Sequence, residues 1–283
     1  MGHDLQRSLF LQGDDHAVLA LHGLRSTPLE LQPLLKALHG AGFTVDAPHL
    51  TRYGFANDPS VGRWREWLAQ ALEHFDRLTA RYRRVTVCGL SMGATLALAV
   101  AAARGSEVAA IAALSTTLHY DGWNTPWYRS LRPLGYFTPL RHRMVIRETS
   151  PFGIKNERLR EWIERQVANN PVSAVGASAL SLPALHEAEK LMRHTRRHLP
   201  QIVSPTLILH ASEDDIASLK KNAQLVQRKV SAAEVRLVQL HDSYHMITLD
   251  NERERVAALT VDFFKTYGTC EASSSAAKST LAA

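Results

Sequence analysis

The sequence has very little cysteine: only Cys88 and Cys270 occur in 283 residues. Two cysteines exclude a framework of disulfides and a cysteine-rich zinc site. A chain of this length needs neither, because its own core buries roughly three quarters of the unfolded surface. Hydrophobic residues make up 45% of the chain and charged residues 21%, which excludes a disordered, collagen-like or low-complexity chain. We expect Cys88 to be a packed small hydrophobic residue and Cys270 to have no role.

The sequence also lacks an unbroken apolar segment of membrane-spanning character. The longest stretch without charge runs over residues 85–103, which is long enough to cross a membrane. Its centre, however, reads Gly-Leu-Ser-Met-Gly at 89–93 and separates a β-rich half from a half rich in Ala and Leu. A strand, a tight turn and a helix explain it better, so we expect no stable membrane insertion. The first fifteen residues carry four charges and no continuous apolar core, unlike an export signal, and we expect a cytoplasmic protein.

Acidic residues are in the minority. The 33 Lys and Arg outnumber the 27 Asp and Glu, for a formal net charge of +6 and a pI near 9.5. Basic residues cluster at 141–147 and 193–198, and nucleic-acid binding rests largely on phosphate neutralisation. The clusters come with neither zinc-finger spacing nor an aromatic and basic RNA-binding signature. We interpret them as solvated helix faces and expect no nucleic-acid partner; a preference for acidic or phosphate-bearing substrates is the alternative.

Strand-like and helix-like segments alternate along most of the chain. The strand candidates are short, apolar and rich in β-branched residues, as expected for parallel strands covered on both faces. They lie at 17–21, 85–88, 108–114, 206–209 and 235–240. Between and after them, apolar residues recur every three or four positions at 29–38, 64–79 and 251–267. This alternation predicts an α/β fold with a mostly parallel sheet.

Residues 116–200 interrupt the alternation. They contain almost no β-branched run, but they hold several aromatic residues and predict a helix over 157–168, with Asn156 as its N-cap, and another that starts near Ser181. The pattern of the first helix places Trp162 and Ile163 on its buried face. We interpret 116–200 as a helical insertion seated on a core formed by residues 1–115 and 201–268. The tail 269–283 is poor in apolar residues, and we expect it to be disordered.

The sharpest motif is Gly-Leu-Ser-Met-Gly, residues 89–93. A G-x-S-x-G sequence between a strand and a helix is typical of a nucleophile elbow, in which a strained turn exposes the serine to substrate. Glycine is needed two residues before and two after the serine, because side chains there would strike the neighbouring strand or helix. The helix that follows directs its first N–H groups toward a developing oxyanion. The motif therefore predicts Ser91 as a nucleophile.

A nucleophilic serine needs a base, and the base needs an acid that orients it. With an elbow, the expected order along the chain is serine, acid, histidine. Three acids, residues 213–215, directly follow the strand candidate 206–209, and two histidines, His241 and His245, follow the strand candidate 235–240. Spacing alone does not choose between the histidines or among the acids. We expect the two acids that are not used to face solvent.

A second oxyanion donor is expected in the loop after an early strand. His22, Gly23 and Leu24 follow the strand candidate 17–21. Glycine at 23 lets the backbone approach a substrate closely, so the N–H of Leu24 is predicted to pair with that of Met92 as the oxyanion hole. Loss of one such donor costs on the order of 10²–10³ in rate. We interpret His22 as a structural loop histidine.

These segments together resemble the α/β-hydrolase superfamily over roughly residues 15–115 and 200–267. The run Ser-Tyr-His-Met-Ile-Thr-Leu-Asp at 243–250 closely resembles the histidine segment of bacterial carboxylesterases and monoacylglycerol lipases. The resemblance selects Asp214 and His245 as the acid and base. It implies a mostly parallel, eight-stranded sheet flanked by helices, with a helical cap inserted after the sixth strand.

The chain departs from that family in two places. Relatives often carry Gly-His-Gly after the third strand, where this chain has Pro-His-Leu-Thr-Arg-Tyr-Gly at 48–54, and the cap is larger and more aromatic. Acyl-chain preference therefore does not transfer. In the cap, Trp123, Trp127, Leu131 and Leu134 recur at helix-like spacing. They either pack the cap onto the core or line an apolar acyl pocket.

The predicted function is hydrolysis of a small or lipid-like carboxylic ester through an acyl-enzyme, with no metal and no organic cofactor. Three alternatives stay open. A thioester, amide or lactone substrate fits the same fold, and acyl transfer to an alcohol differs only in the acceptor. A non-catalytic binding protein is the third alternative, although such a protein has no need of an intact triad and two oxyanion loops. The physiological ester, the acyl-chain length and the oligomeric state do not follow from the sequence.

Overall fold

The computed structural model describes residues 7–55, 61–125, 135–136, 138, 145–147, 149–169, 172–173, 176–177 and 179–268. Trp127, most of the basic cluster 141–147 and the tail 269–283 with Cys270 lie outside these described residues. The disorder predicted for the tail is therefore not tested.

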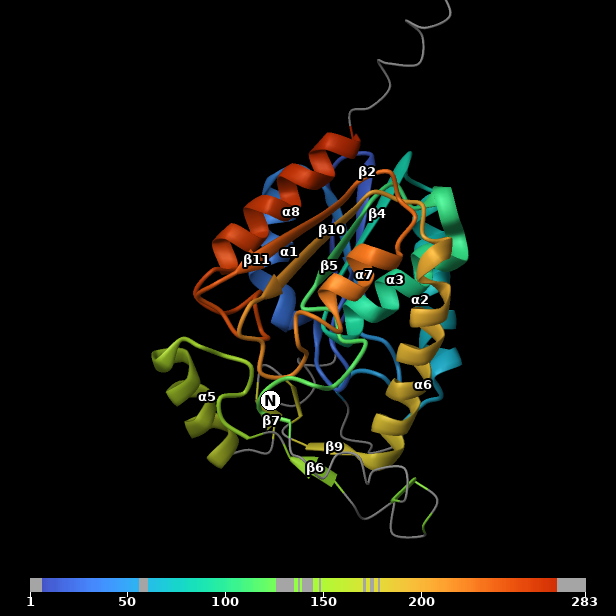
Figure 1. Cartoon of the computed structure of the whole chain (residues 1–283). Helices are drawn as coiled ribbons and strands as arrows, with labels where there is room; N and C mark the ends of the chain where they lie inside the picture. Colours follow the sequence, from blue (N-terminus) through green and yellow to red (C-terminus); the bar gives the residue numbers. More distant parts are fainter. Residues whose placement is uncertain are drawn as a thin grey trace, which may run out of the picture.

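A mostly parallel sheet forms the centre of the molecule (Figure 1). Its strand order is β1-β3-β2-β4-β5-β10-β11, and only the edge pair β1 and β3 is antiparallel. The strands are β1 (Leu9–Leu11), β2 (His16–Leu21), β3 (Thr44–Ala47), β4 (Arg84–Leu90), β5 (Ile111–Leu114), β10 (Thr206–Ala211) and β11 (Val235–Leu240). Because the strands from β3 to β11 in this order are parallel, their carboxyl ends meet at one edge of the sheet.

The expected count of eight strands was one too high for the described residues. The sheet has seven strands there, and residues 116–200 follow its fifth strand, β5, instead of a sixth. The predicted mostly parallel α/β architecture is confirmed.

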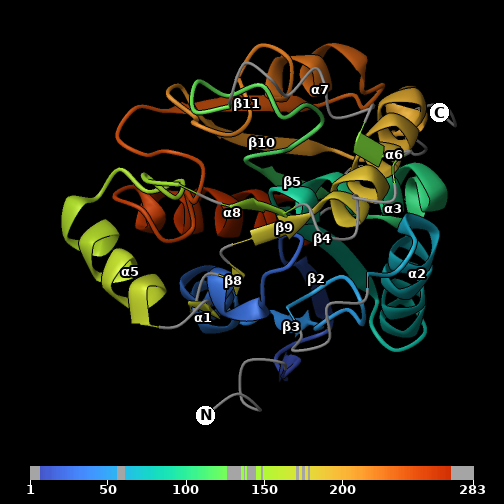
Figure 2. The same cartoon turned by 90° about the horizontal axis from the view of Figure 1, so that it is seen from below.

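Helices cover both faces of the sheet. Figure 2 shows α1 and α8 on one face, and α2 and α3 with α6 on the other. Their bounds are α1 (Gln32–Gly40), α2 (Trp64–Thr79), α3 (Met92–Arg104), α6 (Leu182–His198), α7 (Ala223–Lys229) and α8 (Arg253–Gly268), with the 3-10 helices η1 (Pro28–Leu31) and η2 (Gly105–Glu107). Strand β4 alternates between the two apolar layers: Val87 packs toward α2 and α3, and Cys88 toward α1 and α8. Cys88 is fully buried, and burial raises the pKa of its thiol to about 12, as expected for a packing residue.

Sequence periodicity located the long elements well and missed the short ones. The helix predicted at 64–79 is α2, and the strand predicted at 235–240 is β11, both with the same bounds. The helix expected at 29–38 is divided into η1 and α1, where Thr27 caps η1 through its side chain and Gln32 starts α1. Strands β1 and β3 were not predicted; they hold only 3 and 4 residues, too few for a periodic pattern.

The described residues of 116–200, the predicted insert, lie mostly at the carboxyl edge of the sheet, and α6 continues from there along α2 and α3 (Figure 1). Helix α6 packs against α3 through residues that include Leu191 and Met192, while α5 (Glu157–Asn169) stands apart from the core helices. Asn156 caps α5 as predicted, since its Oδ1 accepts from the N–H of Leu159 at 2.9 Å. The insert also holds the short antiparallel pairs β6 (Val145–Arg147) with β9 (Ala179–Ser181) and β7 (Val172–Ser173) with β8 (Gly176–Ala177), besides η5 (Leu199–Gln201).

Trp162 does not lie on the buried face of α5 as predicted. Its side chain is exposed, whereas that of Ile163 is fully buried. Among the described α5 side chains, residues 157–165, only that of Ile163 is buried, so the apolar pattern of this helix extends beyond the surface that it buries. Among the described residues, no helix combines the length and the apolar character needed to cross a membrane.

Candidate active site

Ser91 stands at the turn from β4 into α3. Its backbone has φ 58° and ψ −119°, a conformation that costs a non-glycine residue free energy and persists where surrounding packing imposes it. A Cβ on Gly89 would lie 2.3 Å from the Gly93 oxygen, and a Cβ on Gly93 would lie 2.0 Å from the Leu21 oxygen. The two glycines of the motif therefore allow backbone to pack directly on backbone, which leaves the serine at the tip of a strained turn.

His245 joins Ser91 to Asp214. Its Nε2 lies 2.8 Å from Ser91 Oγ, and its Nδ1 lies 2.8 and 3.0 Å from the two oxygens of Asp214. The histidine comes from the loop after β11 and the acid from the loop after β10. Both side chains are almost completely buried. The structure thus brings together all three residues that were predicted as nucleophile, base and acid.

The neighbouring candidates lie elsewhere. His241 is exposed, and its Nδ1 lies 3.3 Å from Ser212 Oγ. Glu213 is also exposed, and its Oε2 accepts from Lys155 Nζ at 2.9 Å. Asp215, in contrast, is 1% exposed, so the expectation that both unused acids face solvent was wrong for this residue. Its side chain turns inward because it bonds backbone amides there, and burial raises the pKa of its carboxyl group.

The environment of Asp214 favours its ionised form. Burial opposes ionisation, but the adjacent His245, through its charge and its hydrogen bond, outweighs that effect with help from other contacts and holds the pKa of the Asp214 carboxyl below its ordinary value. Among these contacts, Asp214 Oδ1 accepts from the backbone N–H groups of Ile216 and Ala217 at 2.9 and 2.7 Å. An ionised, fixed acid at this position can hold one tautomer of His245 and stabilise its imidazolium form.

Two further side chains at this site were not predicted. His210, fully buried in β10, places its Nε2 3.4 Å from Asp214 Oδ2 and 2.8 Å from the Ala217 oxygen. Burial lowers its pKa, so it is a neutral neighbour of the acid. Thr117 places its Oγ1 3.2 Å from Ser91 Oγ. Their position in the sequence could have indicated a role. His210 lies near the carboxyl end of β10 and Thr117 just beyond that of β5, and side chains of parallel strands converge at that edge of the sheet.

Several backbone N–H groups of the loop after β2 donate to acceptors among the described residues, and the N–H of Leu24 is an exception. The amide of Gly23 donates to the Glu30 carboxylate, that of Arg25 to the Tyr53 oxygen at 2.9 Å, and that of Ser26 to the Gly23 oxygen at 3.2 Å. Within the described residues the Leu24 amide has no such acceptor. Met92 is the first residue of α3, so its N–H has no acceptor inside the helix. The close approach of Gly93 to the end of β2 sets this loop beside the elbow.

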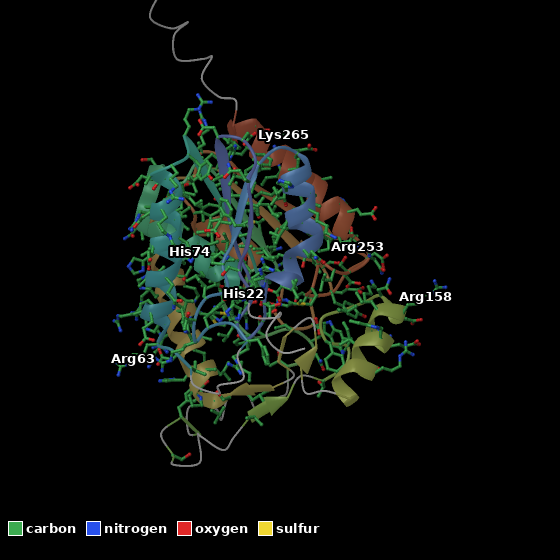
Figure 3. All side chains as sticks on the ribbon, turned by 180° about the vertical axis from the view of Figure 1, so that it is seen from behind. His22, Arg63, His74, Arg158, Arg253 and Lys265 are labelled. Atoms are coloured by element: carbon green, nitrogen blue, oxygen red, sulfur yellow. The ribbon has the colours of Figure 1, made fainter. Side chains whose placement is uncertain are left out.

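Glu30 fixes the shape of that loop. Its buried carboxylate accepts from the Gly23 amide and from the Ser26 hydroxyl, and its backbone oxygen accepts from Thr248 Oγ1 at 2.8 Å. His22 lies at the end of the sheet that faces the insert (Figure 3). Its Nδ1 lies 2.8 Å from the Gly23 oxygen, and burial lowers its pKa to about 3. A buried, neutral histidine in this loop agrees with the prediction that His22 has a structural role.

The predicted pocket residue Trp123 is 60% exposed. Its Nε1 donates to the Glu213 oxygen at 3.0 Å, and its ring meets that of Tyr244 edge-on with 5.6 Å between centroids. Two cavities, of about 430 and 230 Å³, lie along α6, and neither is lined by Trp123, Ser91 or His245. Trp127 lies outside the described residues. Within the described part of the chain, no group of three or more His, Cys, Asp or Glu side chains is arranged to hold a metal ion.

A parallel sheet that carries a serine on a strained strand-to-helix turn, followed in chain order by an acid and a histidine in hydrogen-bonding contact, defines the α/β-hydrolase class. The family model described as "Serine aminopeptidase, S33" (Hydrolase_4) matches residues 12–253. The chain belongs to this family.

Relatives of known activity support that assignment. The chain is 26% identical to the thermostable monoacylglycerol lipase of Bacillus sp. strain H-257 over 248 residues, which cover 87% of this chain and 89% of the relative. It is 23% identical to a carboxylesterase of Bacillus subtilis strain 168 over 268 residues, which cover 90% and 94%. A structure from work on LipS and LipT, two metagenome-derived lipolytic enzymes, superimposes with a TM-score of 0.78 at 23% identity and covers 93% of this chain and 98% of its own. The predicted class, a serine hydrolase of the esterase and lipase type, is confirmed.

Proposed function

We propose that the protein hydrolyses carboxylic esters through an acyl-enzyme formed on Ser91, with His245 as base and Asp214 as its orienting acid. The observation that carries the proposal is the continuous hydrogen-bonded series from Ser91 Oγ through both nitrogens of His245 to Asp214, with contacts of 2.8 Å at each end. Such a series gives the serine hydroxyl a base at hydrogen-bonding distance before substrate arrives.

The mechanism begins when Ser91 Oγ attacks the ester carbonyl carbon and His245 Nε2 takes the hydroxyl proton. Asp214 holds the Nδ1–H of the imidazole and stabilises the imidazolium that forms. The N–H groups of Leu24 and Met92 bind the oxyanion of the tetrahedral intermediate. His245 then protonates the leaving alcohol, and in the second half it deprotonates the water that releases the acid from Ser91.

The relatives support a proposal for the substrate class. Because one is named a monoacylglycerol lipase and another a carboxylesterase, we propose a lipid-like or small ester as substrate. We also propose that residues 1–115 and 201–268 act as the hydrolase core and that 116–200 acts as a cap beside the site. Trp123 is then a candidate for contact with substrate at the edge of the site, since its exposed ring meets Tyr244, the residue before the base.

An amide substrate is the second candidate, because the matching family is described as a serine aminopeptidase. The same three residues act in both reactions, and only the leaving group differs. Initial rates on chromogenic esters of increasing acyl length, measured beside aminoacyl anilides, distinguish the two.

The proposal expects turnover of esters, with a maximum at one acyl length, and much slower or no release from anilides. In the Ser91→Ala variant, ester turnover should fall about 10⁵–10⁶-fold while the protein stays folded by circular dichroism. Turnover that survives this change would refute the role of Ser91. Faster release from anilides than from esters would move the assignment to amide hydrolysis.

A further inference from the structure

A turn of the insert packs directly against the loop that carries His245. The insert turn, residues 153–156, precedes α5, and the histidine loop, residues 241–250, follows β11. The N–H of Met246 donates to the Gly153 oxygen at 2.8 Å. Gly153 has φ +71°, and a Cβ there would lie 3.1 Å from His245 Cβ and 3.0 Å from Met246 Cγ. Glycine at 153 therefore allows the insert backbone to touch the residue that acts as base.

Asp250 links the two segments with four backbone hydrogen bonds. Its carboxylate is fully buried. Oδ2 accepts from the N–H of Lys155 at 2.7 Å and of Tyr244 at 2.8 Å, and Oδ1 accepts from Asn156 at 2.9 Å and Asn251 at 3.0 Å. Each oxygen thus receives one amide of the insert turn and one of the segment 244–251. A carboxylate that satisfies four amides in this way fixes the two segments relative to each other.

Asp215 makes a second link, closer to the base. Its Oδ2 accepts from the Gly153 N–H at 3.1 Å and its Oδ1 from the His245 N–H at 3.4 Å. Its backbone oxygen also accepts from the Asn124 N–H at 3.0 Å, in the first part of the insert. Asp215 is adjacent in sequence to Asp214, so one short segment orients the imidazole ring with one carboxylate and the backbone of the same histidine with the next.

The carboxylates of Asp215 and Asp250 accept from backbone N–H groups, so both act on the backbone that carries the His245 ring. Removal of such an acceptor leaves buried N–H groups unpaired, which is costly. The loop would then move toward other acceptors or water. Because a shift of about 1 Å in a catalytic group costs on the order of 10² in rate, backbone anchoring of this kind bears directly on the base.

We propose that Asp250 and Asp215 are positioning residues for His245, and that they do so by binding the histidine loop to the insert turn. The insert is then part of the structure that holds the base, in addition to any contact with substrate. The inference rests on the proposed function, since it assigns these acids a role in the reaction of that same site.

The test compares Asp250→Asn with wild type and with Asp242→Asn. Asparagine keeps the shape of the side chain, but its NH₂ group faces two backbone N–H groups in place of an acceptor. Asp242 provides the matched control, because it lies in the same loop with a side chain 66% exposed. Among the described residues that side chain has only a distant ion pair, 4.0 Å from Lys155 Nζ. Ester hydrolysis is measured per folded protein, and amide hydrogen exchange of residues 153–156 and 244–246 is measured without substrate.

The proposal expects kcat of Asp250→Asn to fall about tenfold to a hundredfold with KM changed less than about threefold, and exchange at both segments to accelerate together. Asp242→Asn should match wild type in both readouts. Asp215→Asn, which loses at most two weaker bonds, should lower kcat by a smaller factor and supplies the test if Asp250→Asn does not fold. Wild-type kcat in Asp250→Asn, or accelerated exchange at only one of the two segments, would overturn the proposal. A wild-type protein that hydrolyses no ester would instead refute the proposed function. The hydrogen-exchange rates would still show whether Asp250 links the two segments.

Discussion

In the core, each chemical group of the site stands at the carboxyl end of a strand. Ser91 follows β4, Asp214 follows β10 and His245 follows β11, while Leu24 lies in the loop after β2. The insert contacts the site through a turn without regular structure, residues 153–156. Backbone amides of this turn donate to Asp215 and Asp250, which also bind the histidine loop. In the proposed mechanism the core therefore provides the reacting groups, and the insert fixes the segment that carries one of them.

Substitutions in the two regions should therefore affect catalysis in different ways. In the proposed mechanism, side chains of the core act on substrate, so their removal should abolish a step of the reaction. Side chains at the junction with the insert act on backbone, so their removal displaces a group that is still present.

The contrast is sharpest between two buried acids. Asp214→Asn replaces the acceptor of the His245 Nδ1–H and stabilises the wrong tautomer, so kcat should fall by about 10⁴, against tenfold to a hundredfold for Asp250→Asn. Steady-state kinetics on the best ester, with folded fraction measured in parallel, provide the comparison. Equal losses in the two variants would remove the distinction between reacting groups and backbone anchors.

A second prediction concerns the backbone contact that makes the elbow. Gly93→Ala places a Cβ 2.0 Å from the Leu21 oxygen, which forces α3 and β2 apart and should lower the free energy of unfolding by roughly 2–4 kcal/mol. Gly40→Ala is the control, since a Cβ at the end of α1 meets nothing within 4 Å. It should raise stability by about 0.5–1 kcal/mol. Urea unfolding measures both, and a Gly93→Ala variant as stable as wild type would contradict the packing.

A third prediction concerns the pH dependence of the free energy of unfolding, to which His22 in the core contributes. The pKa of His22 is lowered from 6.5 to about 3, so the unfolded chain takes up a proton that the folded chain does not. The contribution of neutral, buried His22 to the free energy of unfolding is fully present above pH 6.5, and it is lost as the pH falls from 6.5 toward 3. Between pH 7 and pH 5 this amounts to about 2 kcal/mol. His22→Gln should reduce the fall in unfolding free energy over that interval by this amount; an unchanged slope would show that His22 is protonated in the folded state.

The reacting groups were predictable from sequence because each belongs to a local pattern. Ser91 lies in a five-residue motif, and Asp214 and His245 follow strands recognisable by their own composition. The choice of Asp214 over Asp215 needed the resemblance to known esterases, since nothing local separates two adjacent aspartates. The expected count of eight strands also came from that resemblance, whereas the described sheet has seven.

The anchoring residues could not be predicted in this way. Asp250 bonds the amides of Lys155 and Asn156, about 95 residues earlier in the chain, and the partner is backbone, which leaves no trace in residue type. The contact of Glu30 with Thr248 and that of Thr117 with Ser91 likewise join residues far apart in the sequence. Such roles follow from the folded arrangement of loops, whereas strand and helix patterns follow from neighbours in sequence.

Covalent labelling with a fluorophosphonate, followed by mass spectrometry of the modified peptide, tests the central claim most directly. An activated serine beside a base and an oxyanion hole should react in minutes, and the adduct should map to Ser91 alone. Labelling should disappear in Ser91→Ala and slow strongly in Asp214→Asn. An adduct on a different serine, or no adduct on folded wild-type protein, would contradict the account of this site.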